Sequence, residues 1–158
     1  GDTQSVVRSG NWHGNDTCWR MVLDLNNCLF FHDGEGRARS EPLRYLAVVD
    51  GIVGGEGNGP MAPDRKDCGV IIAGTHPAAV DCVAATVMGF DWEKLKLLNG
   101  CFGVTQKKFV PFGAAEICVA SSNKDWCGKL AAMEGVFAFR PHFGWVGAIE
   151  NGRRAPAE

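Results

Sequence analysis

Two aspartates stand where an acidic side chain could bind a metal or move a proton. Asp81 lies in PAAVDCVAATVM, a segment of small, mostly apolar residues with no basic residue. A buried carboxylate is costly unless a cation or hydrogen-bond donors compensate it. Asp50 ends the apolar run LRYLAVVD. We therefore predict that Asp50 and Asp81 share a site, as ligands of a divalent cation or as acid and base. The alternative is a structural role, in which Asp81 pins a loop by a hydrogen bond.

A glycine-rich segment follows Asp50 directly. DGIVGGEGNGP, residues 50 to 60, has five glycines in eleven positions. It matches neither the GxGxxG dinucleotide fingerprint nor the GxxxxGK[ST] phosphate loop. Successive glycines can nevertheless turn several N–H groups toward one anion. We predict a loop that binds an anionic small molecule through Gly55, Gly57, Asn58 and Gly59. The alternative is a tight crossover that passes close to neighbouring elements.

Two histidines and a third aspartate are further candidates. His13 could move a proton, which makes it a candidate catalytic residue beside Asp50 and Asp81. Asp16 and His76 stand at expected helix N-termini, where anions bind, so both are predicted ligand-binding residues. Each has a structural alternative, with Asp16 as a helix cap and the histidines as packed side chains.

Composition excludes several classes of function. The 158 residues carry a formal charge of -2, which gives no basic surface for nucleic acid or for a membrane. No apolar run approaches the roughly 18 residues that span a bilayer, and no signal peptide opens the sequence. The seven cysteines have no close pair or regular spacing. We therefore predict reduced thiols in the cytoplasm and no iron–sulfur cluster or zinc ribbon.

The elements that position these residues follow from periodicity and punctuation. A helix is expected in DTCWRMVLDLNNCLFFH, capped by Asp16 or Thr17. The apolar runs LRYLAVVDGIV and CGVIIAGTHP are typical of strands covered on both faces. Pro77 and Gly89 bracket the helix that contains Asp81.

Weaker patterns complete the expected fold. DWEKLKLLNG predicts a short helix, and AAEICVASS and GVFAFRP predict two further strands. We expect a single α/β domain over residues 1–150, with a mixed, mostly parallel sheet covered by helices, and a flexible tail at 151–158. Asp50 and Asp81 would then meet at the carboxyl edge of the sheet, where such folds bind ligands.

The stretch from Asp50 to Leu98 resembles a bacterial and archaeal family, domain of unknown function 362. DGIVGGEGNGP and GVIIAGTHPAAVDCVAATVMGFD carry the resemblance, and GNWHGNDTCWRMVLDLN is similar to a block from one branch. The sequence pattern of that family begins with an aspartate and a glycine before a GNGP turn. A strand follows, and then the motifs DPVAVDAVAA and MGF. His76 stands where the family reads aspartate. The family positions that carry over are Asp50, Gly51, Gly57, Gly59, Pro60, Asp81 and Gly89.

The resemblance implies positions but no reaction. Family members often carry an iron–sulfur segment with clustered cysteines, which this sequence lacks, so a redox role does not transfer. Family domains are longer at the N-terminus, which implies the C-terminal part of a longer domain, or a short form completed by a partner chain. We expect an enzyme-like domain that binds an anionic small molecule, with Mg²⁺ or Mn²⁺ at Asp50 and Asp81. The alternative is a non-catalytic structural or assembly module, acting as a homo-oligomer or with a partner chain.

Overall fold

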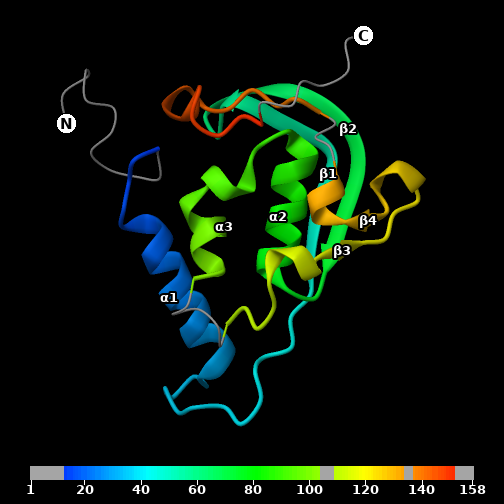
Figure 1. Ribbon diagram of the computed structural model, residues 1–158. Helices are drawn as coiled ribbons and strands as arrows, with labels where there is room; N and C mark the ends of the chain where they lie inside the picture. Colours follow the sequence, from blue (N-terminus) through cyan, green and yellow to red (C-terminus); the bar gives the residue numbers. More distant parts are fainter. Residues whose placement is uncertain (1–12, 104–108, 134–136, 152–158) are drawn as a thin grey trace, which may run out of the picture.

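The fold is built around one central helix, α2 (Pro77–Met88). The computed structural model describes residues 13–103, 109–133 and 137–151. Within them, α1 and α3 lie on one side of α2 and a long β-hairpin curves around the other (Figure 1). The remaining helices and strands are α1 (Cys18–Phe31), α3 (Lys96–Cys101), β1 (Ala47–Asn58), β2 (Ala62–Gly74), β3 (Cys118–Val119) and β4 (Gly128–Lys129). Short 3-10 turns lie at Trp92–Lys94, Ala114–Glu116, Lys124–Trp126, Leu130–Ala132 and Phe143–Trp145.

The described sheets are two-stranded and antiparallel. β1 pairs with β2 from Ala47 opposite Gly74 to Asn58 opposite Ala62, and β3 pairs with β4. The predicted α/β fold with a mixed, mostly parallel sheet is therefore wrong. Parallel strands need a crossover of a dozen or more residues, whereas the link from Asn58 to Ala62 allows only a tight turn. The glycine-rich segment, predicted as a loop, forms most of β1.

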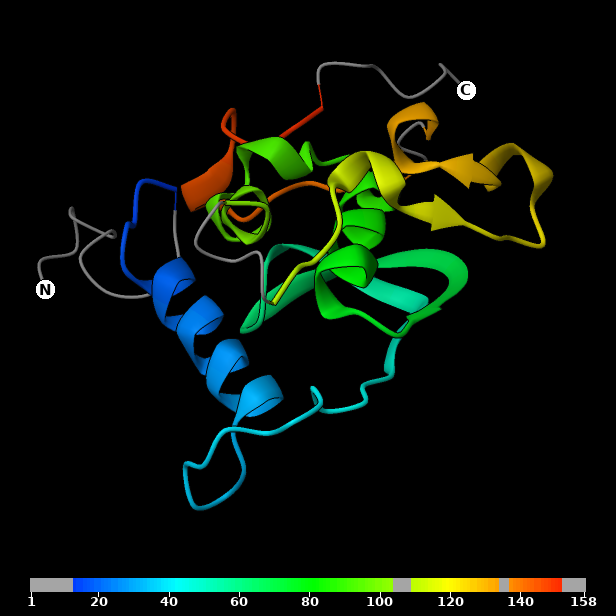
Figure 2. The same cartoon turned by 60° about the horizontal axis from the view of Figure 1, so that its bottom comes forward.

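The hairpin has one covered face and one exposed face. Gly74 lies against α2 so closely that a Cβ atom there would stand 2.7 Å from Cγ2 of Val80. On the opposite face Val48 is 62% exposed and Ile71 is 65% exposed. The apolar runs therefore do not mark strands covered on both faces. Figure 2 shows the curved hairpin with α2 on its inner side.

Local signals place α2 correctly. Pro77 stands in the first turn, where its missing N–H leaves no hydrogen bond unmade. Gly89 closes the helix with φ 90°, a left-handed conformation that glycine adopts without strain, and its N–H donates to the carbonyls of Ala85 and Thr86. The small side chains of α2 let neighbouring elements approach from several directions. The predicted helix is confirmed.

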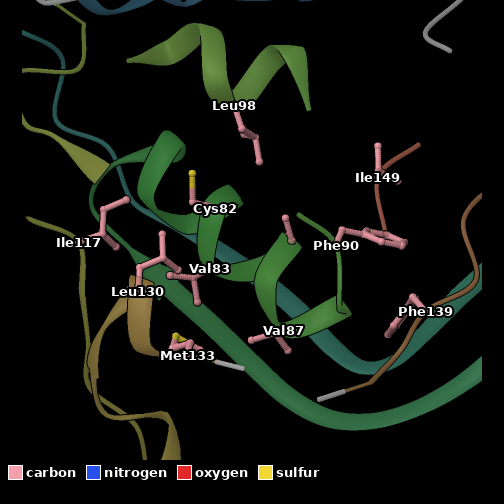
Figure 3. Packing of buried hydrophobic residues seen from close by; sticks show 11 residues of the cluster. Cys82, Val83, Val87, Phe90, Leu98, Ile117, Leu130, Met133, Phe139 and Ile149 are labelled. Carbon is pink, nitrogen blue, oxygen red and sulfur yellow. The ribbon is translucent and has the colours of Figure 1, made fainter. Parts of the chain in front are cut away.

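Two apolar clusters form the core. The first surrounds α2 and joins it to the 3-10 turns that follow and to Phe139 (Figure 3). The second lies between α1, α3 and the start of α2, where Leu23, Phe30 and Phe31 form the buried face of α1. The buried members of the first cluster are Cys82, Val83, Ala85, Val87, Phe90, Leu98, Ile117, Leu130, Met133, Phe139 and Ile149. Because α2 contributes to both clusters, it connects the hairpin to the other helices.

The remaining predicted elements are only partly found. The expected α1 is confirmed, whereas DWEKLKLLNG divides into a 3-10 turn and the short α3. AAEICVASS contains only β3, and residues 137–141 of GVFAFRP form no strand. Residues 135–136 of that segment lie outside the described residues. So does the predicted tail, apart from Asn151.

Candidate functional site

Asp81 lines a hollow between the helices. The hollow has a volume of about 270 Å³, and its walls come from α2, α3, the turn before α1 and Trp145. On α2 it is lined by Asp81, Ala84, Ala85 and Met88, whose spacing places them on one helical face. This face points toward α3 rather than toward the hairpin. α2 therefore presents one carboxylate to an otherwise largely apolar space.

The carboxylate of Asp81 has no internal compensation among the described residues. It makes no hydrogen bond or ion pair with them, and burial by its surroundings raises the pKa of the carboxyl. Water still reaches the side chain, since Asp81 is exposed to solvent. Hydrocarbon on the remaining sides explains why its pKa rises despite that exposure. Asp81 is thus an accessible acid held in a weakly solvating pocket.

The neighbouring thiols do not offset this charge. Burial raises the pKa of Cys82 to about 12, with smaller contributions from Cys101 and from the charge of Asp81. Burial likewise raises the pKa of Cys101 to about 11. Both thiols are therefore protonated and neutral near neutral pH.

The two lysines that line the hollow direct their charges elsewhere. The Lys96 ammonium contacts Oδ1 of Asp16 at 3.1 Å. The Lys94 ammonium donates to the Glu150 carbonyl at 2.9 Å and lies 3.5 Å from Oδ2 of Asp91. Because both ammonium groups contact partners other than Asp81, it is the aliphatic parts of the two lysine side chains that line the hollow. Of the charged side chains that line the hollow in the described chain, Asp81 is therefore the one without an ion pair.

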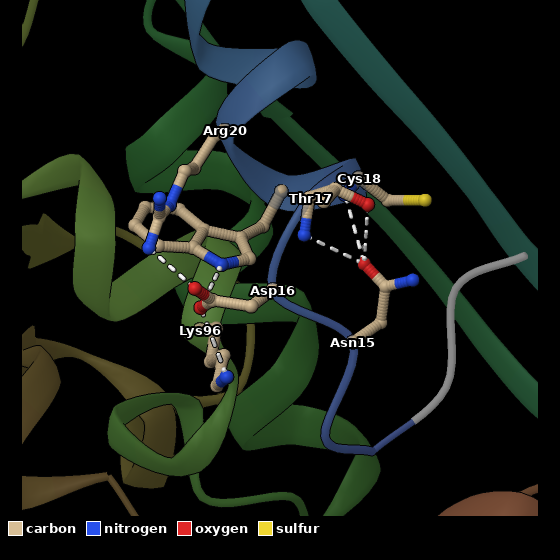
Figure 4. A network of polar contacts seen from close by, with 7 residues as sticks. Asn15, Asp16, Thr17, Cys18, Arg20 and Lys96 are labelled. Carbon is tan, nitrogen blue, oxygen red and sulfur yellow. Dashed lines mark hydrogen bonds and ion pairs between the residues drawn. The ribbon is translucent and has the colours of Figure 1, made fainter. Parts of the chain in front are cut away.

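The turn before α1 supplies the other side of the hollow. Figure 4 shows the polar contacts that hold this turn. Oδ1 of Asn15 accepts hydrogen bonds from the N–H groups of Thr17 at 2.8 Å and Cys18 at 2.9 Å, and so caps the helix. Asp16 instead accepts from Trp19 Nε1 and pairs with Arg20 and Lys96. These contacts, the Lys96 hydrogen bond first, lower the pKa of Asp16. Asn15 was missed because Asp16 and Thr17 beside it have equally good capping side chains.

Aromatic rings form part of the wall. Trp19 lines the hollow from α1, and Trp145 lines it from the far end of the chain. His13 also lines it, with its ring 5.8 Å from that of Trp145. The structure thus brings two predicted site residues, His13 and Asp81, into one hollow. Trp145 was missed because nothing local in the sequence indicates which distant segment covers α2.

Asp50 does not share this hollow. It pairs across the hairpin with Ile71 on the exposed face, opposite the face that carries Gly74 and meets α2. Its Oδ1 accepts a hydrogen bond from the N–H of Ile52 at 3.1 Å. The structure therefore places Asp50 and Asp81 on opposite sides of both the hairpin and α2. The predicted meeting at a sheet edge depended on parallel strands, which the chain does not form.

The glycines of β1 let another segment pass over the hairpin. A Cβ atom on Gly54 would stand 2.9 Å from Cζ of Phe139. The Gly57 N–H donates to the Arg140 carbonyl at 2.9 Å, and the Gly59 N–H donates to the Gly57 carbonyl at 3.0 Å. Gly55 and Asn58 lie in the paired strand, opposite Arg65 and Ala62. This geometry agrees with the close-crossover alternative; anion binding by the segment stays a prediction.

His76 belongs to a different part of the molecule. Its Nε2 lies 2.8 Å from the Phe109 carbonyl oxygen, and its ring packs against Phe109 and Phe112. Within residues 13–103, 109–133 and 137–151, no group of three or more His, Cys, Asp or Glu side chains could hold a metal. The predicted magnesium or manganese site thus gains no cluster from the structure, and the metal stays a prediction.

Comparison with protein families decides the relationship proposed from the sequence. The model of the family described as "Domain of unknown function (DUF362)" matches residues 5–86, about half of the chain. The chain belongs to the DUF362 family. Searches among curated proteins and among solved structures give no match.

The DUF362 match covers only part of the lining of the hollow. It includes the turn before α1, Asp81 and Ala84, but it ends before Met88. Lys94, Lys96 and Trp145 lie beyond it. The DUF362 segment therefore supplies the acid, and the following residues close the hollow around it. Among the described residues, no helix has the length and apolar character needed to cross a membrane.

Proposed function

We propose that this DUF362 chain binds a small organic molecule bearing a protonated amine in the hollow beside Asp81. One observation carries the proposal: the Asp81 carboxylate lies in a largely apolar hollow without an ion pair or hydrogen bond to the described residues. A charge in such surroundings gains most from a partner of opposite sign. An ammonium group supplies both the charge and the hydrogen-bond donors that the carboxylate lacks.

The walls favour an organic cation over a hydrated metal ion. Trp19 and Trp145 offer aromatic surface, which attracts cations and packs against flat apolar groups. A volume of about 270 Å³ suits a molecule smaller than most drug-sized ligands. Magnesium prefers several oxygen ligands, whereas Asp81 is the one acidic side chain on this wall within the described residues. The amine would lie at Asp81 and the carbon skeleton between the rings.

The expected anionic ligand fits this hollow less well. An anion would meet the unpaired charge of Asp81, and the nearby ammonium groups of Lys94 and Lys96 are already paired. The N–H groups of Gly57 and Gly59, which were to hold the anion, already donate to carbonyls. We therefore base the proposal on the charge of the hollow rather than on the glycine-rich segment.

The same geometry would also allow acid–base catalysis at Asp81. A carboxylate with a raised pKa is a stronger base than an ordinary aspartate, and a base next to a bound molecule can take its proton. His13 lines the same hollow and is a second candidate proton carrier. The proposal thus includes an acid–base enzyme as its stronger form.

We also propose that the chain is cytoplasmic, because all seven cysteines are free thiols.

Three probes of similar size and different charge test the proposal. Benzylamine, benzyl alcohol and benzoate share one ring, so thermal shifts at equal concentration isolate the effect of the head group. Benzylamine should raise the melting temperature by roughly 2–5 °C at saturating concentration, and the other two should raise it less. Asp81→Asn should abolish the benzylamine shift. Asp24→Asn, which removes an exposed charge from α1, should keep it.

Two results would contradict the proposal. Benzoate could stabilise the protein more than benzylamine does, which would show that the hollow selects negative charge. Alternatively, Asp81→Asn could retain the full benzylamine shift, which would show that binding occurs elsewhere. Isothermal titration calorimetry of the wild-type protein and both variants gives the stoichiometry and confirms that one site is measured.

A further inference from the structure

A second and larger hollow lies on another face of α2. It has a volume of about 620 Å³ and runs between β2 and the segment that contains β3. One wall is formed by residues 69–75, the other by residues 116–122, and Val80, Val83 and Val87 of α2 form its floor. Figures 1 and 2 both show β3 on the side of β2 that faces away from β1. We name this space the β2–β3 groove.

The first wall of the groove is an unpaired strand edge. β2 pairs with β1 along one side and belongs to a two-stranded sheet. Among the described residues, no backbone group of residues 69–74 bonds to anything except β1. An edge strand directs half of its N–H and C=O groups away from its partner. These groups therefore lie along the groove without a protein partner in the described chain.

The second wall resembles the first. β3 pairs with β4 through Cys118 and Val119, so its other edge is free of strand partners within the described residues. The chain continues through Ala120 to Ser122 along the same wall. A single extended segment placed in the groove would have a strand edge on each side. Neighbouring strands in a sheet satisfy each other's backbone groups in this way.

The floor determines which side chains such a segment would carry. Val80, Val83 and Val87 are buried apolar side chains, and Met133 lines the same space. Of the charged side chains, Glu116 reaches this lining, and its Oε1 already accepts from the Gly113 N–H at 2.9 Å. Alternate residues of an extended strand point to the same face. The floor therefore suits apolar side chains at every second position.

We propose that the β2–β3 groove binds one extended strand of a partner polypeptide by β-strand addition. Backbone hydrogen bonds to the edges of β2 and β3 hold the segment, and its alternate apolar side chains pack on α2. The partner is a protein segment with alternating apolar and polar residues and no charge at the apolar positions. This surface lies on a different face of α2 from Asp81, so the inference is independent of the proposed amine ligand.

A short synthetic strand tests the backbone pairing directly. The probe is a fluorescent seven-residue peptide with lysine at both ends, valine at positions 2, 4 and 6, and threonine between. The control is the same peptide with the backbone nitrogens of the three valines methylated. Methylation keeps the side chains and removes three backbone hydrogen-bond donors. Fluorescence anisotropy should show binding of the first peptide. The N-methylated peptide should bind at least about tenfold more weakly.

Hydrogen exchange of the wild-type protein locates the bound strand. The peptide should slow amide exchange within residues 69–75 and 117–122, and it should leave exchange within β1 unchanged, because β1 already pairs with β2. Ala79→Glu places a charged side chain in the groove at a helix N-terminal position that tolerates acids. It should abolish binding, whereas Ala131→Glu, outside the groove, should not. Circular dichroism checks that both variants are folded.

Several outcomes would overturn the proposal. Equal binding of the N-methylated peptide would mean that apolar contact, rather than strand addition, drives association. The same holds if a folded Ala79→Glu variant binds normally or if hydrogen exchange of residues 69–75 does not change. Absence of binding at millimolar peptide excludes the site. Protection of residues 69–75 without peptide, rising with protein concentration together with a dimer in analytical ultracentrifugation, would instead assign the groove to a second copy of this chain.

Discussion

Gly54 of β1 lies directly beneath the ring of Phe139. A Cβ atom at Gly54 would stand 2.9 Å from Cζ and 3.1 Å from Cε1 of that ring. Such distances are shorter than normal van der Waals contact, so only glycine allows the two segments to approach this closely. Phe139 in turn belongs to the core cluster around α2. The contact therefore explains one glycine of the glycine-rich segment by packing rather than by a ligand.

Gly54→Ala should destabilise the protein. The added methyl group must push the Phe139 ring out of its position, and overpacking of this kind costs about 1–3 kcal/mol. Urea denaturation followed by tryptophan fluorescence measures the change. Gly34→Ala is the matched control, because a Cβ atom at Gly34 meets nothing within 4 Å. An equal stability for the two variants would show that the 137–140 segment does not pack on the hairpin as described.

Glu56→Gln should weaken the attachment of the same segment. Burial of Glu56 acts to raise its pKa, but hydrogen bonds from the Arg140 N–H and guanidinium, with the charge of Lys66, lower the pKa overall. A lowered pKa means that the carboxylate stabilises the folded state above about pH 4 and that this contribution is lost as the pH falls further. At pH 7 the variant should melt roughly 3–6 °C below the wild type.

The pH dependence of the melting temperature distinguishes the contribution of the Glu56 charge from that of its hydrogen-bond geometry. The difference in melting temperature between the wild type and Glu56→Gln should narrow as the pH falls from about 4 through the lowered pKa of Glu56, below which both side chains are neutral. Glu41→Gln, at an exposed position, should match the wild type at every pH. A difference that stays constant from pH 7 to pH 3 would show that the hydrogen-bond geometry of Glu56, rather than its charge, stabilises the crossing.

Short-range signals in the sequence were sufficient for α1 and α2. Pro77 and Gly89 bracket α2 because their backbone restrictions act within a single turn, and the apolar period of α1 predicts its buried face. The β-branched runs located only part of β1 and part of β2. The antiparallel pairing does not follow from these runs, because the many glycines favour a loop. Once the glycine-rich segment is a strand, only residues 59–61 remain for the connection between β1 and β2.

The candidate site depended on contacts that local patterns do not encode. Asp81 was conspicuous as an acid among small apolar residues, and His13 stood in a polar turn. Their common hollow forms only when Trp145, far along the chain, covers α2. Asp50 was assigned to the same site by a sheet-edge rule that applies to parallel strands. In an antiparallel hairpin the register instead places Asp50 opposite Ile71 on the exposed face.

Thiol reactivity should follow burial. Cys82 and Cys101 are buried, with the pKa of each thiol raised to about 12 and about 11, whereas Cys28 and Cys118 are exposed. Because the thiolate is the reactive form, iodoacetamide at pH 8 should modify the buried pair at least about 100-fold more slowly. Mass spectrometry of timed digests gives each rate. In guanidinium chloride the four rates should become similar, and similar rates in the native protein would contradict the described core.

Asp81→Asn should stabilise the protein at neutral pH. Burial raises the pKa of Asp81, so the folded state holds its proton at a pH where the unfolded chain has lost it. The free energy of unfolding therefore falls as the pH rises from about 4 through the raised pKa, and the deficit persists above it. Removing the charge removes that deficit. The gain should be only about 1–3 °C in melting temperature, because water reaches the carboxylate and screens it.

Melting curves of the wild type and Asp81→Asn between pH 3 and pH 8 show the sign directly. The two curves should converge at the acidic end and separate as the pH rises, with the variant more stable. Asp24→Asn should follow the wild type throughout, since Asp24 is exposed on α1. If Asp81→Asn instead melts well below the wild type at pH 7, the carboxylate has an internal partner. The hollow would then lack the unpaired charge on which amine binding depends.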